Sequence, residues 1–358
     1  MNEPAAILER AVEQKDIPGA VLRVERAGRL VHESAHGVTR YDTPHPVRLD
    51  TWFDLASLTK ILATTPVAMR LFDRGDLDLD APLHDFLPDV AEDFGRQPFY
   101  RFLHHTSGAR PSGSYHRLMP PELVATAGGK TWTKSQLAEE RPAYEPGTRQ
   151  VYSDIGFALA GWALERLSGA SLDDLFQREV AGPLRITDLL FLQVTPRSVD
   201  SIAATQDCPW RGRVVCGVVH DYDTYAAGGA LGQAGLFGTA AAVARVVEEF
   251  RLALQGESDW LSNSAMTAFL NNADHLPGVD YRLGFDTVSA VGSTAGDHFS
   301  RDTFGHLGFT GVSAWCDPKA ELTVVLLTNR LHPSIENLAI RTLRPAVHNA
   351  VWKELFDG

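Results

Sequence analysis

The sequence is poor in cysteine and carries fewer basic than acidic residues. Its 358 residues include three cysteines, an odd number that forms no disulfide framework and is typical of a reducing compartment. Its 33 lysines and arginines are outnumbered by 45 aspartates and glutamates, which gives a formal net charge of -12. Because nucleic-acid binding normally requires a basic surface, a nucleic-acid partner is excluded.

The sequence also lacks long apolar segments and the motif of one large enzyme class. No apolar run is long enough to cross a membrane, and residues 1–17 mix charged with apolar side chains where an export signal has an apolar core. We therefore expect a cytoplasmic protein with no membrane partner, unless an export signal has been removed. The Gly-x-Ser-x-Gly motif of α/β-hydrolases is absent. Paired cysteines at metal-ligand spacing are absent too, and we expect neither a metal nor another cofactor.

Strand patterns lie near both ends of the chain, and helical patterns lie between them. The hydrophobic fraction of 44% is that of an ordinary globular protein, and the length suits one large domain or two intertwined ones. Turn residues separate β-rich runs in two places, which predicts two antiparallel pairs: 20–25 with 29–34, and 311–316 with 322–328. The last helix has an apolar residue at every fourth position and should pack on a sheet: Leu343, Val347, Val351 and Leu355.

These patterns predict an α/β (α+β) fold with two parts. The two ends of the chain form one antiparallel sheet flanked by helices, and the middle forms a mostly helical lobe. We place the sheet domain at residues 1–75 and 270–358 and the helical domain at residues 76–269. The active site is expected in the cleft between the two.

Ser57 and Lys60 are the first pair of residues that could carry chemistry. They are three residues apart in Phe-Asp-Leu-Ala-Ser-Leu-Thr-Lys, and on a helix residues at this spacing share a face. A serine nucleophile needs a proton acceptor at such a distance. Unpaired backbone N–H groups at a helix N-terminus could also stabilise negative charge on a substrate oxygen. The motif is short, and the alternative is a solvated helix turn.

Tyr152 begins a second candidate, Tyr-Ser-Asp, just before a predicted helix at residues 155–167. A nearby lysine ammonium would lower the pKa of Tyr152 from about 10, and the phenolate could then take the proton of Ser57. The alternative is a half-buried tyrosine beside a helix N-cap formed by Ser153 or Asp154.

His306 begins a third candidate, His-Leu-Gly, at the start of the late strand pair. The glycines at 308 and 311 would let a ligand approach the edge of the strand, with His306 beside it. By contrast, the glycine-dense segment 228–238 has no Gly-Lys-Ser/Thr after it, which favours close backbone packing over phosphate binding.

Taken in order, the three motifs resemble those of the serine β-lactamase and penicillin-binding protein superfamily. The similarity is greatest to β-lactamase-related serine hydrolases, the group of class C β-lactamases, DD-peptidases and lactamase-fold esterases. The likeness extends from about residue 17 to about residue 344 and includes His105-Thr106-Ser107-Gly108, Val219-His220-Asp221, Gly235-Leu236-Phe237 and Thr328-Asn329-Arg330.

The resemblance implies a role for each motif. Ser57 would be the acylated nucleophile, Lys60 its activator, and Tyr152 the general base for acylation and the acid for the leaving group. The backbone N–H groups of Ser57 and Phe309 would form the oxyanion hole. Substrate-binding positions would be Asp154, His306, Gly308 and His220, although His220 could instead belong to a hydrogen-bonded pair that supports a loop.

Two departures from the family pattern bear on the substrate. Asp154 stands where relatives commonly have asparagine, and a carboxylate cannot donate a hydrogen bond and would repel an anionic substrate. His306 stands where many have lysine, and a neutral histidine is a weaker anchor for a substrate carboxylate. Both changes favour neutral esters or amides over β-lactams.

The resulting hypothesis is a serine hydrolase that forms an acyl-enzyme on Ser57 with a small ester or amide. Three alternatives stay open from the sequence. One is a penicillin-binding DD-peptidase or weak β-lactamase, the second is acyl transfer to an acceptor other than water, and the third is a non-catalytic module that binds a β-lactam or peptide. The partner in every case is a small molecule.

Overall fold

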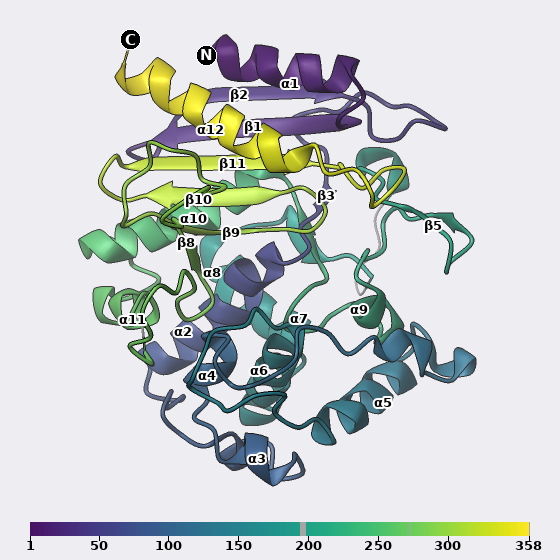
Figure 1. Cartoon of the computed structure of the whole chain (residues 1–358), viewed down its shortest axis with the longest axis vertical. Helices are drawn as coiled ribbons and strands as arrows, with labels where there is room; N and C mark the ends of the chain where they lie inside the picture. The colour runs from purple at the N-terminus through teal and green to yellow at the C-terminus, as the bar shows by residue number, and fades with distance from the viewer. Residues whose placement is uncertain (194–197, 272, 358) are drawn as a thin grey trace.

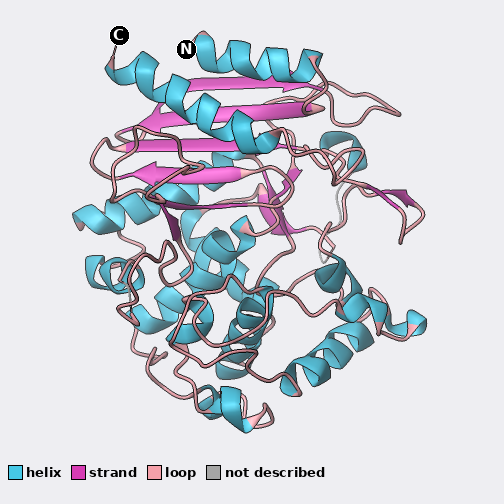
Figure 2. Ribbon diagram, viewed as in Figure 1, coloured by secondary structure: helices cyan, strands magenta, loops and turns pink. Residues whose placement is uncertain are grey.

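The strands of the chain gather mainly in one antiparallel sheet that joins its two ends. The computed structural model describes residues 1–193, 198–271 and 273–357. Six strands lie side by side in the order β2-β1-β11-β10-β9-β8 (Figures 1 and 2). Their bounds are Gly19–Arg26 (β1), Arg29–Gly37 (β2), Asp286–Thr287 (β8), Phe304–Leu307 (β9), Ser313–Asp317 (β10) and Leu322–Thr328 (β11). The predicted fold class and both predicted antiparallel pairs are confirmed.

Alternating side chains give the sheet two apolar faces. In the pairing of β1 with β11, Leu22 lies opposite Leu326, and both point toward one face. Val21 and Leu327, one position away, are opposite each other and point toward the other face. Because side chains alternate along a strand, one apolar run supplies both cores.

Helices cover both faces of the sheet. The terminal helices α1 (Glu3–Glu13) and α12 (Ile340–Phe356) lie against one face, where Leu8 and Val347 join its core (Figure 1). The other face packs against α10 (Ala240–Gln255), whose N-cap Thr239 accepts a hydrogen bond from the N–H of Ala242. This helix falls inside the range assigned to the helical domain, although it contacts the sheet; the division of the chain stays a prediction.

Helices dominate the remainder of the chain, below the sheet in Figure 1. Their centre is α6 (Asp154–Ser168), which begins after the N-cap Ser153. Its C-cap is Gly169, a residue with a φ of 67°. The predicted helix at 155–167 is thus confirmed. The other α-helices here are α2 (Thr65–Asp73), α3 (Glu92–Gly95), α4 (Tyr100–Leu103), α5 (Ala127–Ala138), α7 (Leu172–Phe176), α8 (Gly182–Leu184), α9 (Tyr222–Ala226) and α11 (Asn263–Phe269). Within the described ranges, no helix combines the length and the apolar character needed to span a membrane.

A small sheet connects the two parts of the molecule. It has the order β3-β7-β4, formed by Phe53–Asp54, Leu236–Gly238 and Leu189–Phe191, and a separate pair joins β5 (Asp207–Cys208) to β6 (Arg213–Val214). The glycine-dense segment leads into β7. A Cβ on its Gly232 would lie 1.9 Å from the carbonyl oxygen of Phe157 in α6, so these glycines serve close backbone packing, as predicted.

Candidate active site

A buried carboxylate holds the turn that presents Ser57. Asp54, in β3, accepts hydrogen bonds from the N–H of Ala56 at 2.8 Å and from that of His220 at 2.6 Å. Ala56 has a φ of 45°, a left-handed conformation that is uncommon outside glycine, and Ser57 follows it directly. Burial raises the pKa of Asp54 to about 6. Asp54 therefore stabilises a strained turn at the position of the candidate nucleophile.

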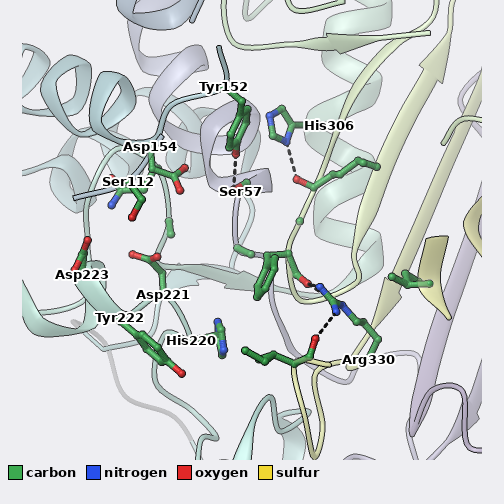
Figure 3. A pocket seen from close by; sticks show the side chains of 18 of the residues that line it. Ser57, Ser112, Tyr152, Asp154, His220, Asp221, Tyr222, Asp223, His306 and Arg330 are labelled. Carbon is green, nitrogen blue, oxygen red and sulfur yellow. Dashed lines mark hydrogen bonds between the residues drawn. The ribbon is translucent and has the colours of Figure 1, made fainter. Parts of the chain in front are cut away.

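Three of the predicted residues meet at the Ser57 hydroxyl. Tyr152 Oη donates a hydrogen bond to Ser57 Oγ at 2.8 Å (Figure 3). Lys60 Nζ donates a second one to the same oxygen at 3.1 Å. Helical residues begin at Leu58, directly after Ser57, and Lys60 starts a π-helical turn, Lys60–Thr64, that leads into α2. Its side chain is fully buried, with Nζ 4.8 Å from the centre of the Tyr152 ring.

Asp154 contacts Lys60, 94 positions away in the chain. Its Oδ1 accepts a hydrogen bond from Lys60 Nζ at 2.7 Å, and about a third of its side chain remains exposed to the cavity. A third bond, at 3.3 Å, runs from Nζ to the carbonyl oxygen of Gln233. Asp154, which sequence reasoning assigned to substrate binding, is thus already paired with Lys60.

Burial changes the expected proton affinities of Lys60 and Tyr152. It lowers the pKa of Lys60, and the charge and hydrogen bond of Asp154 only partly offset this. It raises the pKa of Tyr152 well above its ordinary value, and the carboxylate of Asp154 adds to the rise. The expectation that a lysine ammonium lowers the pKa of Tyr152 is therefore wrong, because burial and nearby carboxylates outweigh it.

His306, in strand β9, and Gly308, directly after it, line the cavity with Ser57. Nδ1 of His306 lies 2.6 Å from the carbonyl oxygen of Leu307, so this nitrogen carries the proton. Burial lowers the pKa of His306 to about 3, and its buried Nε2 has no partner within the described residues. A Cβ on Gly308 would lie 2.8 Å from the carbonyl oxygen of Leu55, so only glycine lets the strand approach the nucleophile turn this closely.

The turn after Gly308 is fixed beside Ser57. The guanidinium of Arg330 donates to the carbonyl oxygen of Phe309 at 2.6 and 3.0 Å, and the Thr310 hydroxyl donates to the carbonyl oxygen of Asp54 at 2.7 Å. In the described part of the chain, neither the N–H of Ser57 nor that of Phe309 donates a hydrogen bond to another residue. Two free backbone donors are what an oxyanion hole requires.

His220 lies at the cavity, but its ring nitrogen is engaged. Nε2 lies 3.0 Å from Oε1 of Gln206, and the ring packs 5.8 Å from that of Phe309. Burial, together with the positive charge of Arg211, lowers the pKa of His220 to about 3. These contacts favour the loop-supporting alternative.

The residues surround a cavity of about 640 Å³ that is open to solvent. Sequence reasoning did not single out several side chains in its wall: Asp223, Gln233, Tyr281, Asp286 and Arg344. Each is distant from the three motifs in the chain, and none belongs to a recognisable motif. Only the folded arrangement brings them to Ser57.

One zinc-like motif, His32-Glu33-Ser34-Ala35-His36, also escaped the sequence reasoning. A zinc site of this pattern requires a helix, whereas these residues lie on strand β2. Both histidines bond to the Ser34 hydroxyl, and Glu33 pairs with Arg23. Among the residues that the structure describes, no group of histidine, cysteine or acidic side chains could hold a metal ion.

Comparisons with known proteins place the chain in a family. A sequence model of the family described as Beta-lactamase matches residues 5–347, nearly the whole chain. The protein belongs to the beta-lactamase family and is a serine hydrolase, as the three motifs predicted.

Among curated relatives is N-acetylmuramyl-L-alanine amidase of Bacillus subtilis (strain 168), 29% identical over 356 residues that span 89% of this chain and 78% of the amidase. Two solved structures share the fold. EstCE1, a hydrolase with promiscuous acyltransferase activity, has a TM-score of 0.76 at 24% identity and covers 97% of each chain. A class C beta lactamase from Rhodobacter sphaeroides has a TM-score of 0.70 at 21% identity and covers 98% of this chain and 100% of its own.

Proposed function

We propose that the protein hydrolyses a small ester or amide through an acyl-enzyme on Ser57. The observation that carries this proposal is the position of Ser57 Oγ, which is hydrogen-bonded to both Tyr152 Oη and Lys60 Nζ at the bottom of an open cavity. A serine hydroxyl is a weak nucleophile and needs a group that takes its proton as it attacks. Both neighbours are within the distance that proton transfer requires.

The pKa shifts support a division of roles between these neighbours. Burial lowers the pKa of Lys60 and so favours loss of a proton from its ammonium group; the amine formed in this way can accept the proton of Ser57 as Oγ bonds to the substrate carbonyl carbon. The carbonyl oxygen then gains negative charge, which the N–H groups of Ser57 and Phe309 would stabilise. Tyr152, whose pKa is raised, stays a phenol and can donate its proton to the leaving group.

The cycle then closes on the same groups. Lys60 returns its proton to Tyr152. A water molecule then attacks the acyl carbon while Lys60 takes a proton from it, and Tyr152 donates its proton to Ser57 Oγ as the bond between the acyl carbon and Oγ breaks. Transfer of the proton from Lys60 to Tyr152 restores both groups. This assignment makes Tyr152 the acid and not the first base.

The charges near Ser57 support a neutral acyl donor. His306 is uncharged, because burial lowers its pKa to about 3, so it offers no cation to a substrate carboxylate. Asp154 already neutralises Lys60. The name of the Bacillus subtilis relative, an amidase, supports an amide bond as one target.

A DD-peptidase or weak β-lactamase is the second candidate. Arg341, an exposed residue of α12, lines the cavity and forms no ion pair in the described part of the chain. A guanidinium there could bind the carboxylate of a penicillin or of a D-alanyl terminus.

Intact-protein mass spectrometry with a fluorophosphonate tests the proposal. The wild type should gain one adduct, whereas Ser57→Ala should gain none. The matched control is Ser135→Ala, which removes an exposed hydroxyl on α5 and should leave labelling unchanged. Labelling of Ser57→Ala at the wild-type rate would refute the assignment of the nucleophile.

A kinetic panel then separates the candidates. Short-chain p-nitrophenyl esters and anilides, nitrocefin and D-Ala-D-Ala peptides are compared, with Ser57→Ala as the blank. The main proposal predicts higher kcat/KM for the esters and anilides. A preference for nitrocefin or the peptides would favour the second candidate, and turnover of none of them would favour a binding module.

A further inference from the structure

One wall of the cavity beside Ser57 is lined by carboxylates. Asp154, Asp221 and Asp223 lie with Ser112 on the same side of Ser57, while Arg330 lies on the other side (Figure 3). Asp154 begins α6, and the other two belong to the segment that forms α9. A small recess of the cavity is lined by the same side chains.

Asp221 differs from the other two because no lysine, arginine or histidine side chain forms an ion pair or hydrogen bond with it where the structure is described. Asp154 pairs with Lys60 at 2.7 Å, and Asp223 lies 2.7 Å from Nδ1 of His116. Thr224 donates to the Asp221 side chain, through its backbone N–H at 2.8 Å and through its hydroxyl, and no ion pair reaches this carboxylate within residues 1–193, 198–271 and 273–357. Burial, with the charges of Asp154 and Asp223, raises the pKa of Asp221 to about 6.

A second acceptor in the same wall is also unused. Gln233 lines both the cavity and the recess, and only 4% of its surface is exposed. Its Nε2 donates to the hydroxyl of Thr224 at 3.1 Å, but its Oε1 has no hydrogen-bond partner among the described residues. A buried polar atom without a partner is costly, and it is satisfied when a ligand or water supplies a donor.

Arg344 and Arg117 line the cavity, but neither forms an ion pair with these carboxylates among the described residues. Arg344 donates to the carbonyl oxygens of Gly308 and Val312 at 2.8 and 2.7 Å, which ties it to the strand side of the cavity. Arg117 lines the cavity, but it is exposed and forms no ion pair with the three carboxylates where the structure is described. The wall therefore offers mainly acceptors to a ligand.

We propose that this wall, through Asp221 and Gln233, selects acyl groups that carry a hydrogen-bond donor, an amine or a hydroxyl, close to the reacting carbonyl. The proposal rests on the hydrolysis proposed for Ser57 and names its substrate class. An ammonium group donates hydrogen bonds to these acceptors and also offsets the negative charge of the wall. A hydroxyl group only donates a hydrogen bond. An acyl group with a carboxylate at this place is repelled.

Isosteric substrates provide the test. Benzyl esters of alanine, lactic acid and isobutyric acid differ only in the group on the α-carbon, which is an ammonium, a hydroxyl or a methyl group. The esters of β-alanine, 3-hydroxypropanoic acid and butyric acid place the same three groups one carbon further out. Both enantiomers are used where the carbon is chiral, and kcat/KM is measured for each ester by release of benzyl alcohol.

In at least one series, the ammonium or hydroxyl ester should exceed the methyl ester by about tenfold or more, the effect typical of a hydrogen bond to a charged group. Asp221→Asn should reduce that ratio to nearly one. Asparagine is also a good N-cap, so the start of α9 is retained. The control Asp93→Asn removes one negative charge from an exposed site on α3 and should leave the ratio at the wild-type value.

Equal kcat/KM for all three groups in both series would overturn the inference, as would an unchanged ratio in Asp221→Asn. Esters that are not turned over are tested as competitors of p-nitrophenyl acetate, and equal inhibition by matched esters also overturns it. Hydrolysis of p-nitrophenyl acetate that depends on Ser57 shows in each case that the proposed function itself stands. Hydrolysis equal in wild type and Ser57→Ala would instead refute the proposed function.

Discussion

Asp274 and Asp221 are both carboxylates withdrawn from solvent, and they differ in what surrounds them. Asp274 accepts hydrogen bonds from the hydroxyls of Tyr100 and Thr106 and lies 3.2 Å from both Arg101 Nε and His104 Nδ1. Burial alone would raise its pKa, but these donors hold the pKa of Asp274 well below its usual range.

The hydrogen bonds to Asp221 come from Thr224, and two carboxylates lie nearby, so burial together with these charges raises the pKa of Asp221 to about 6. The comparison shows that burial does not decide what a carboxylate does. A carboxylate surrounded by donors stabilises the fold, and one left short of donors beside a nucleophile is available to a ligand.

The largest effect on activity is expected when Lys60, the partner of Asp154, is replaced. Lys60→Met should lower kcat/KM for p-nitrophenyl acetate by about 10³–10⁴-fold, because Ser57 loses its proton acceptor. Lys60→Arg should be similarly impaired, since a guanidinium keeps its charge but does not give up its proton at neutral pH. Steady-state kinetics measure both, and an active arginine variant would show that Lys60 supplies charge alone.

Removal of the Tyr152 hydroxyl is expected to be severe but not total. Tyr152→Phe should reduce kcat/KM by about 10²–10³-fold, because the leaving group loses its acid while Lys60 and the backbone donors remain. The control is Tyr144→Phe, whose hydroxyl lies outside the cavity and bonds only weakly, at 3.4 Å, to the carbonyl oxygen of His105. Esters with a good leaving group should be affected less than anilides, and the opposite order would contradict the role of acid.

Asp274→Asn should act on stability and not on chemistry. Because the variant leaves Arg101 without its carboxylate, we expect the free energy of unfolding to fall by about 3 kcal/mol at pH 7, with kcat/KM of the folded enzyme unchanged.

The pH dependence follows from the depressed pKa of Asp274. Its stabilising effect is fully present above the unfolded pKa of about 4 and is lost as the pH falls through the lower folded pKa. Urea unfolding at several pH values measures the difference between wild type and variant, and a difference that does not shrink in acid would contradict this account.

Asp221→Asn should change the free energy of unfolding in the opposite direction to Asp274→Asn. A carboxyl group whose folded pKa is raised destabilises the fold increasingly as the pH rises from about 4 to about 6, and fully above that. The variant should therefore be more stable than wild type by about 1–2 kcal/mol at pH 7 and nearly equal to it at pH 4. The same urea titrations measure this, and a loss of stability at pH 7 would show that Asp221 has a structural partner.

Asp154→Asn should produce the smallest change. Asp154 raises the pKa of Lys60, so its removal should lower that pKa further. The rising limb of the profile of kcat/KM against pH should then move about one pH unit toward acid. A limb that stays in place would show that Lys60 does not control this ionisation.

Local patterns explain why much of the fold could be predicted. The β-rich run at residues 322–328 and the apolar residue at every fourth position after Leu343 are local patterns of one strand and one helix, and both elements formed as predicted. Sequence reasoning put Ser57 at a helix start, and helical residues do begin directly after it at Leu58, although the segment Lys60–Thr64 is π-helical. The strain at Ala56 depends on Asp54 and His220, which no local pattern connects.

By itself, the sequence determined that Ser57 and Lys60 are near each other, because a spacing of three residues places them one turn apart. It also determined that the two ends of the chain supply strands. Only the tertiary structure decided the charges around the pair. Asp154 reaches Lys60 across 94 positions, and burial lowers the pKa of Lys60 while it raises those of Tyr152 and Asp221. The physical reason is that a pKa depends on solvent exclusion and on charges nearby in space, and both are properties of the folded chain.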